Sequence, residues 1–290
     1  MVTPPGAGPA GTVRETPFTV FNEKGDPLRG DLRYTAGGRP APLILVCHGF
    51  TAHKDWGPFP FIGNALAAAG FASAVFNFSH NGMGPGFRRF TELEKFSRNT
   101  IGREVGDVRA LVDAAAAGVL GKGILDPSRI GILGHSRGGG VALLAASRDE
   151  RIRAVVGWGS VATFRRFTPH QREIWERDGF LPVTVRGMRT RLRYGIEILR
   201  DLDANADAYD LHRAAAALRV PLLLVHGEAD VSVKPEEARS LVDAAGGTLR
   251  QMVVIGGTGH AFGAGHPWRA SNPALDRAIA ETAAWFHSYL

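Results

Sequence analysis

Short apolar segments typical of buried strands alternate with amphipathic helical segments along most of this chain. The apolar segments that we expect to be strands are 13–22, 28–35, 42–47, 72–78, 129–133, 154–158, 222–225 and 251–255. Helices are expected over 61–69, from residue 101 to about 118, after residue 136, and over 275–289. Strands that are apolar throughout are covered on both faces of a sheet. The sequence therefore predicts an α/β fold with a mostly parallel central sheet of about eight strands and helices on both faces.

One segment interrupts this alternation. With 290 residues, of which 44% are hydrophobic, the chain is long enough for one large core. Residues 1–12 are rich in Pro, Gly and Ala and predict a disordered tail, so the globular domain is expected over 13–290. Residues from about 161 to 205 contain nine arginines, several aromatic residues and no strand pattern. We expect a helical insertion that covers the carboxyl ends of the strands as a lid; the alternative is a helical excursion whose arginines face water.

Composition and spacing argue against several other classes of protein. The net charge is +6, but the basic residues are scattered, so a nucleic-acid partner is not expected. Cys47 is the only cysteine and lies in an apolar run, which predicts a small core residue without a disulfide. His48, His53 and Asp55 match no metal-binding spacing, so no metal site is expected. Without a recognisable secretory signal or a stretch of 18 apolar residues, we expect a cytoplasmic protein with no membrane span.

The pentapeptide Gly134-His135-Ser136-Arg137-Gly138 joins an apolar strand to a helix. A serine at the apex of so tight a turn points away from the sheet, and glycines on both sides avoid collisions with neighbouring backbone. Gly-x-Ser-x-Gly by itself is moderately specific, and the alternative is an ordinary turn serine. The strand before it and the helix after it supply the context that the motif requires. The pattern therefore predicts a nucleophilic Ser136.

A nucleophilic serine needs a base within hydrogen-bonding reach and a group that orients this base. Asp230 follows the strand over 222–225, and His260 lies in the glycine-rich loop after the strand over 251–255. Glu228 is a second carboxylate, two residues before Asp230, but it is expected to be a solvated turn residue. His266 lies farther from its strand end, beside a proline. The candidates therefore occur in the order serine, acid, histidine.

Four motifs resemble those of the α/β-hydrolases, and most closely the dienelactone-hydrolase and prolyl-oligopeptidase-like serine esterases, which include the bacterial cinnamoyl and feruloyl esterases. The motifs are His48-Gly49-Phe50-Thr51, Gly134-His135-Ser136-Arg137-Gly138-Gly139, His226-Gly227-Glu228-Ala229-Asp230 and Gly259-His260. One of them would be weak evidence, but four in the family's order are specific. They span nearly the whole chain from about residue 15, so the resemblance implies the α/β-hydrolase fold.

The resemblance also implies a role for each of five residues. Ser136 would be the nucleophile, and His260 would act first as general base and then as general acid. Asp230 would hold His260 in the required tautomer and stabilise its imidazolium form. The backbone N–H groups of Phe50 and Arg137 would form the oxyanion hole.

These expectations together describe a serine esterase that cleaves small to medium acyl or aryl esters through an acyl-serine intermediate. No cofactor is expected, and the partner is a small-molecule ester. We expect Phe164, Phe167 and Trp175 to line the substrate pocket; His80 is a further candidate, with an ordinary loop histidine as its alternative. The same triad serves peptidases, thioesterases and acyltransferases. A non-catalytic binding protein is a weaker alternative because all three triad residues are present. The acyl group, the alcohol and the oligomeric state stay open.

Overall fold

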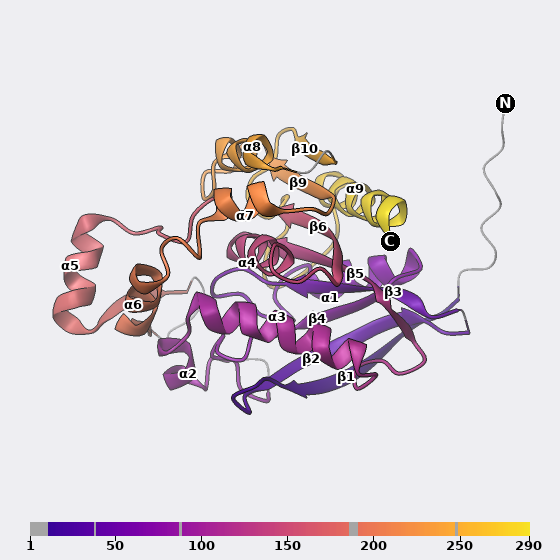
Figure 1. Cartoon of the computed structure of the whole chain (residues 1–290), viewed down its shortest axis with the longest axis horizontal. Coiled ribbons are helices and arrows are strands. Elements are labelled where there is room, and N and C mark those ends of the chain that lie inside the picture. Colours follow the sequence, from indigo (N-terminus) through magenta and orange to yellow (C-terminus); the bar gives the residue numbers. More distant parts are fainter. Residues whose placement is uncertain (1–10, 38, 87–88, 186–190, 247–248) are drawn as a thin grey trace.

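The computed structural model describes residues 11–37, 39–86, 89–185, 191–246 and 249–290 (Figure 1). Most of the predicted N-terminal tail, residues 1–10, lies outside the described residues. The two tail residues that are described, Gly11 and Thr12, are exposed and precede the first strand. None of the described helices is long and apolar enough to cross a membrane.

An eight-stranded sheet forms the centre of the molecule, with the strand order β1-β2-β4-β3-β5-β6-β9-β10. Its strands are β1 (Val13–Phe21), β2 (Pro27–Thr35), β3 (Ala41–Cys47), β4 (Ala72–Phe76), β5 (Leu125–His135), β6 (Ile152–Trp158), β9 (Leu222–Gly227) and β10 (Arg250–Ile255). β2 pairs antiparallel with β1 and β4, and all other neighbours pair in parallel. The predicted α/β fold with a mostly parallel sheet of about eight strands is therefore confirmed.

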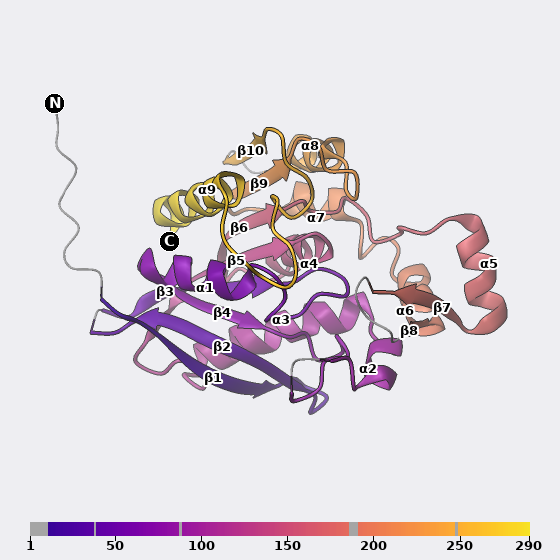
Figure 2. The same ribbon diagram turned by 180° about the vertical axis from the view of Figure 1, so that it is seen from behind.

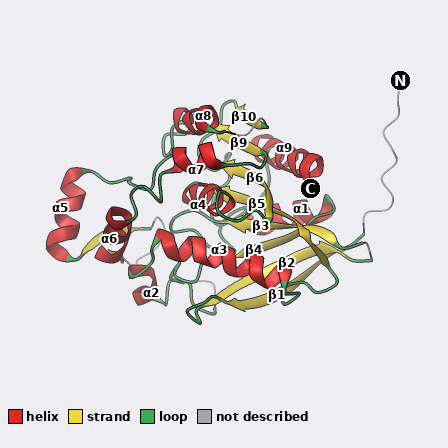
Figure 3. Ribbon diagram, viewed as in Figure 1, coloured by secondary structure: helices red, strands yellow, loops and turns green. Residues whose placement is uncertain are grey.

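Helices cover both faces of this sheet (Figure 3). The helices are α1 (Phe59–Ala68), α2 (Leu93–Ser97), α3 (Ile101–Ala116), α4 (Arg137–Ala146), α5 (Pro169–Asp178), α6 (Ile196–Ala204), α7 (Leu211–Ala217), α8 (Pro235–Ala244) and α9 (Pro273–Tyr289). α3, α4, α7 and α8 pack on one face, and α1 and α9 pack on the other. The expected helices are present with shifts of about two residues at their ends, while α2, α7 and α8 are additional.

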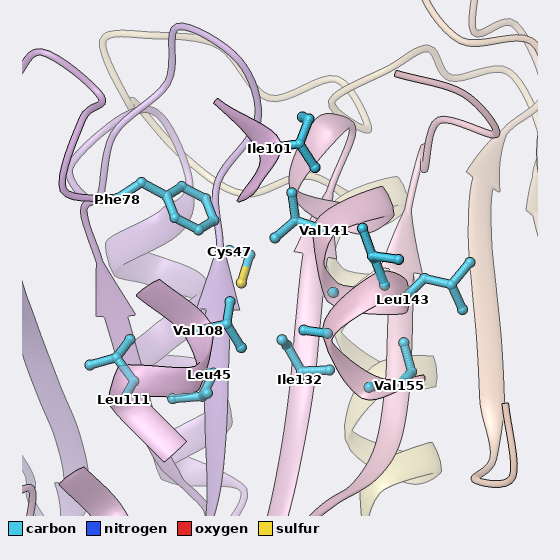
Figure 4. Packing of buried hydrophobic residues seen from close by; sticks show 14 of the residues in the cluster. Leu45, Cys47, Phe78, Ile101, Val108, Leu111, Ile132, Val141, Leu143 and Val155 are labelled. Atoms are coloured by element: carbon cyan, nitrogen blue, oxygen red, sulfur yellow. The ribbon is translucent and has the colours of Figure 1, made fainter. Parts of the chain in front are cut away.

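The parallel strands are apolar on both sides because each side meets a layer of helices. In β3, Leu45 belongs to the core beneath α3 and α4, whereas its neighbours Ile44 and Val46 belong to the core beneath α1 and α9. Cys47 lies in the first of these cores and is fully buried, as predicted (Figure 4). Burial raises the pKa of its thiol well above the usual value, which keeps it protonated.

The region over 161–205 holds α5 and α6, and between them a second sheet. β7 (Phe180–Thr184) and β8 (Arg191–Gly195) pair antiparallel there, so the region expected to be a helical insertion without strands contains a hairpin as well as helices. In β8, Leu192 and Tyr194 are buried while Arg191 and Arg193 are exposed, which is the two-residue period of a strand. The alternation is difficult to recognise in the sequence because β8 is short and its exposed positions are arginines. Figure 2 shows β7, β8, α5 and α6 grouped at one end of the molecule, near α2.

Candidate active site

Ser136 is the single residue between the end of β5 and the start of α4. Its backbone has φ of 58° and ψ of −120°, a conformation that strains any residue with a side chain. A Cβ atom on Gly134 would lie 2.1 Å from the carbonyl oxygen of Gly138, and one on Gly138 would lie 2.5 Å from that of Cys47. The two glycines of the motif are therefore required by the tightness of the turn that presents Ser136.

Asp230 and His260 are brought together from the ends of β9 and β10. Nδ1 of His260 lies 2.7 Å from Oδ2 of Asp230, whose side chain has no exposed area. Oδ1 of Asp230 accepts hydrogen bonds from the backbone N–H groups of Ser232 (2.9 Å) and Val233 (3.0 Å). Burial by itself raises the pKa of Asp230, but the hydrogen bonds from Val233 and His260 outweigh it and lower this pKa below the ordinary value. Asp230 is therefore an ionised acceptor for the Nδ1–H of His260.

His226 is a further contact of Asp230 that sequence analysis treated as part of a motif without a role. Its Nε2 donates to the carbonyl oxygen of Val233 at 2.9 Å and lies 3.3 Å from Oδ2 of Asp230. The His226 side chain is completely buried. It holds the turn whose N–H groups bind Asp230. The sequence shows that His226 lies at a strand end near Asp230, but it does not indicate where the His226 side chain points.

A cavity of about 320 Å³ lies beside Ser136. Phe50, Arg137 and His260 line it together with Ser136. The region over 161–205 contributes Val161, Thr163, Phe164, Arg166, Phe167, Trp175, Leu181, Val183, Tyr194, Ile198 and Leu202 to its wall. The cavity is therefore largely apolar, and it lies between the strand ends and this inserted region.

The expected pocket residues fall into two groups. Phe164, Phe167 and Trp175 all line the cavity. His80 is not among the lining residues; its Nδ1 lies 3.0 Å from Oγ of Ser79 and 3.9 Å from Oδ2 of Asp26. The structure thus places His80 as a buried loop histidine, which was the alternative reading of this residue.

Ser136 and His260 face the same cavity. The hydrogen bonds within the described parts of the chain do not include one between Oγ of Ser136 and Nε2 of His260. Catalytic hydrogen bonds of this kind are often long in a free enzyme and tighten when substrate binds. Gly159 leaves room for the imidazole, because a Cβ atom there would lie 3.0 Å from Nδ1 of His260. Acyl transfer requires a nucleophile, a base that is held in position and space for the substrate. The site offers a serine in a strained turn, a histidine oriented by a buried carboxylate, and an adjacent cavity.

Comparison with known protein families places the chain. The prolyl oligopeptidase family matches residues 62–290, which is most of this chain. This chain belongs to the prolyl oligopeptidase family. Two uncharacterized 31.7 kDa proteins of Escherichia coli, from the traX-finO intergenic region, are each 25% identical to this family member over 251 residues. The match covers 76% of this chain and 83% of each relative.

Solved structures similar to this prolyl oligopeptidase family member share its α/β-hydrolase fold. A dienelactone hydrolase from Anabaena variabilis superimposes with a TM-score of 0.63 at 19% identity, covering 96% of this chain and 99% of the other. Est1E from Butyrivibrio proteoclasticus, with ferulic acid bound, gives a TM-score of 0.69 at 18% identity, covering 93% and 98%. The expected resemblance and fold are thereby confirmed. The protein is a serine hydrolase of the α/β-hydrolase type.

Two backbone N–H groups of this family member are candidates for an oxyanion hole. Phe50 lies in the loop after β3, and Arg137 is the first residue of α4, where backbone N–H groups have no partner within the helix. Within the part of the chain that the structure describes, neither N–H group donates to a protein oxygen. A Cβ atom on Gly49 would lie 3.1 Å from Cβ of Ser136, so the glycine lets this loop approach the serine.

Two histidines hold the loops around Ser136. Nδ1 of His48 donates to the carbonyl oxygen of Gly49 at 2.9 Å, and its Nε2 accepts the N–H of Phe78 at 3.3 Å. Nε2 of His135 donates to the carbonyl oxygen of His260 at 3.0 Å. Burial lowers the pKa of His48 to about 3 and that of His135 to about 4. Both rings are therefore neutral at neutral pH, where they act as hydrogen-bonding supports.

The low pKa of His48 predicts a loss of stability in acid. Between about pH 6.5 and pH 3 this histidine is protonated when unfolded but neutral when folded, so the free energy of unfolding falls as the pH is lowered through this range. Its share of the slope is about 1.4 kcal/mol per pH unit. We expect His48→Gln to remove that share in urea titrations from pH 6 to pH 4.5. His170→Gln, at an exposed site, is the matched control and leaves the slope unchanged. An unchanged slope in His48→Gln would show that His48 takes up a proton in the folded protein.

Several described arginines of the inserted region pair with acidic side chains. Arg165 and Arg172 both bind Asp203, at 2.8 and 2.6 Å. Arg166 donates to both carboxylate oxygens of Glu237, at 2.8 and 2.7 Å. These partly exposed pairs each contribute little to stability. They do, however, tie the inserted region together and, through Glu237, to α8. Among the described residues, no three His, Cys, Asp or Glu side chains are grouped so that they could hold a metal ion.

Proposed function

We propose that this protein is a serine esterase that hydrolyses small to medium carboxylic esters through an acyl-serine intermediate. The observation that carries the proposal is the joint placement of Ser136 and His260 on one apolar cavity, with His260 bonded to the buried carboxylate of Asp230. We also propose that the region over 161–205 acts as a lid, because its side chains form most of the cavity wall.

In the proposed mechanism, Oγ of Ser136 attacks the ester carbonyl carbon and transfers its proton to Nε2 of His260. The carbonyl π electrons move to oxygen, which accepts hydrogen bonds from the N–H groups of Phe50 and Arg137; one such donor contributes about 3–4 kcal/mol to the transition state. Collapse of this intermediate releases the alcohol with the proton from His260. His260 then activates a water molecule that releases the acid, while Asp230 stabilises the imidazolium form throughout.

The cavity favours an uncharged apolar acyl or aryl group. Its volume of about 320 Å³ is at the small end of the range for ligand pockets. Its aromatic wall residues are Phe50, Phe164, Phe167, Trp175 and Tyr194. Among the residues that the structure describes, the two arginines on the wall already pair with carboxylates, Arg137 with Glu104 and Arg166 with Glu237. These pairs argue against recognition of a substrate carboxylate by either arginine. The aryl acid bound to Est1E supports an aryl group as one candidate.

Membership of the prolyl oligopeptidase family keeps peptide hydrolysis as the main alternative. A matched pair of substrates separates the two: a p-nitrophenyl ester and a p-nitroanilide with the same acyl group, over a series of acyl lengths. We expect turnover of the esters, with a maximum at short to medium or aryl acyl groups, and little or no cleavage of the anilides. Anilide cleavage at rates comparable to the esters would favour a peptidase. Folded protein that cleaves neither substrate would contradict the proposal.

Thioesterase and acyltransferase activities use the same acyl-enzyme and differ in the groups that donate or accept the acyl chain. A thioester with the preferred acyl group measures the first, and added alcohols that compete with water measure the second. We expect hydrolysis of the oxygen ester to exceed both. Formation of a new ester in preference to the free acid would instead identify an acyltransferase.

A further inference from the structure

One side chain of the lid contacts both residues whose N–H groups would form the oxyanion hole. Tyr194 lies in β8 and is buried. Its ring centroid lies 4.9 Å from that of Phe50, and its hydroxyl accepts a hydrogen bond from Nη1 of Arg137. Cζ of Arg137 lies 5.3 Å from the centre of the Phe50 ring and 5.5 Å from that of Tyr194. Tyr194, Phe50 and Arg137 therefore form one packed group at the wall of the cavity.

The opposite side of this group is fixed to the body of the protein. Nε of Arg137 donates to Oε2 of Glu104 at 2.9 Å, and Oε1 of Glu104 accepts Nδ2 of Asn99 at 2.7 Å. Glu104 is a buried residue of α3. The guanidinium is thus held between α3 and the lid. Within the described residues its Nη2 is buried and has no hydrogen-bond partner, so the contacts to Glu104 and Tyr194 are what hold it.

Backbone hydrogen bonds also hold the turn at this point. The N–H of Ser136 donates to the carbonyl oxygen of Trp158 at 2.8 Å, and the carbonyl oxygen of Ser136 accepts the N–H of Gly139 at 3.0 Å. Arg137 is followed by Gly138, Gly139 and Gly140 in the first turn of α4, and none of the three has a side chain that could fix the turn. The glycines are required by close packing: a Cβ atom on Gly139 would lie 2.5 Å from Oγ of Ser160, and one on Gly140 would lie 2.9 Å from a methyl carbon of α7. The side chain of Arg137 therefore adds a side-chain anchor, through Glu104 and Tyr194, to the turn that carries its own N–H group.

We propose that Tyr194 is a positioning residue that completes the oxyanion hole from the lid. By packing on Phe50 and accepting a hydrogen bond from Arg137, it fixes the two side chains whose backbone N–H groups face the reacting carbonyl. The hole is then fully formed when β8 packs against the body of the protein. This inference rests on the proposed ester hydrolysis, and it makes the position of the lid part of catalysis as well as of substrate binding.

Removal of the hydroxyl isolates this contribution. Tyr194→Phe keeps the ring on Phe50 but removes the acceptor for Arg137. Because the oxyanion exists in the transition state and not in the bound ester, we expect kcat to fall about 10-fold with KM little changed, less than the about 10²–10³-fold effect of a whole donor. Tyr209→Phe is the matched control, since it also removes one phenol hydroxyl, which there binds Asp201 at 3.0 Å outside this cavity. We expect it to keep both kcat and KM.

A pair of ketone inhibitors distinguishes positioning from a change in pocket shape. Oγ of Ser136 adds to the carbonyl carbon of a trifluoromethyl ketone, its proton passes to His260, and the carbonyl π electrons move to an oxygen that occupies the oxyanion hole. The matching methyl ketone binds without substantial addition. We expect Tyr194→Phe to weaken inhibition by the trifluoromethyl ketone about 10-fold, in parallel with kcat/KM, and to leave methyl ketone binding unchanged.

Several results would overturn the inference. If Tyr194→Phe weakens both ketones equally, or raises KM at constant kcat, then Tyr194 only shapes the pocket. If Tyr194→Phe is less stable than Tyr209→Phe and part of the sample is inactive, the fraction of active sites is measured by titration. The kcat is then calculated per active site before the variants are compared. Active wild-type protein with an unaffected Tyr194→Phe variant would overturn this inference alone. Wild-type protein that neither cleaves esters nor binds the trifluoromethyl ketone would overturn the proposed function, and the inference with it.

Discussion

Ser136→Ala is expected to lower kcat/KM for ester hydrolysis by about 10⁴-fold or more, because it removes the atom that forms the acyl-enzyme. The residue lies in a strained positive-φ conformation, and alanine fits the space that the serine occupies. We therefore expect the variant to fold and to bind a substrate analogue as the wild type does. Initial rates with the preferred p-nitrophenyl ester measure the loss.

Ser147→Ala is the matched control for this substitution. Ser147 follows the other end of α4, where its hydroxyl donates to the carbonyl oxygen of Leu144 at 2.9 Å. The control should retain the wild-type rate. If Ser136→Ala keeps more than about a tenth of the wild-type kcat/KM, the nucleophile lies elsewhere and the proposed mechanism fails.

Asp230→Asn is expected to lower kcat by about 10⁴-fold while leaving the cavity intact. The amide matches the carboxylate in shape, but its NH₂ group cannot accept the Nδ1–H of His260, so the base is held in the wrong tautomer. The N–H groups of Ser232 and Val233 still find an acceptor in the amide oxygen, which limits the structural change. Steady-state kinetics with the same ester, together with thermal unfolding, separate lost catalysis from lost folding.

Glu228→Gln tests the rival acid beside it. Oε2 of Glu228 accepts the backbone N–H of Gly257 at 3.0 Å on the surface, and a glutamine oxygen can take the same place. We expect near wild-type activity. A large loss in Glu228→Gln with a small loss in Asp230→Asn would exchange the roles of the two carboxylates.

Sequence analysis predicted the parts of the molecule for which the residue pattern itself indicates the structure. The strands could be recognised because the parallel sheet is buried on both faces and its strands are apolar throughout. The tight turn at Ser136 could be recognised because Gly134 and Gly138 have no room for a side chain. Asp230 and His260 could be paired because both follow parallel strands, whose carboxyl ends lie at the same edge of the sheet.

The hairpin in the inserted region and the direction of the His80 side chain were not predicted. The hairpin of β7 and β8 was missed because its strand period is short and rich in arginine. His80 follows a strand, as Asp230 and His260 do, but its ring lies near Asp26, and His80 is not among the residues that line the cavity.

The sequence does contain one indication of the buried ion pair between Glu104 and Arg137. Glu104 lies at the spacing of the apolar face of α3, three residues after Ile101 and four before Val108. A carboxylate at such a position needs a buried partner. Nothing in the sequence indicates that the partner is Arg137, or that Tyr194 of β8 binds the same guanidinium.

Labelling with a fluorophosphonate, read by intact mass, tests the central claim most directly. An activated serine displaces fluoride from the reagent and gains one phosphonyl group, which requires the serine and its base to work together. The account predicts a single adduct on the wild-type protein, none on Ser136→Ala, and much slower labelling of Asp230→Asn. Folded wild-type protein that gains no adduct, or Ser136→Ala that is labelled at the wild-type rate, would contradict it.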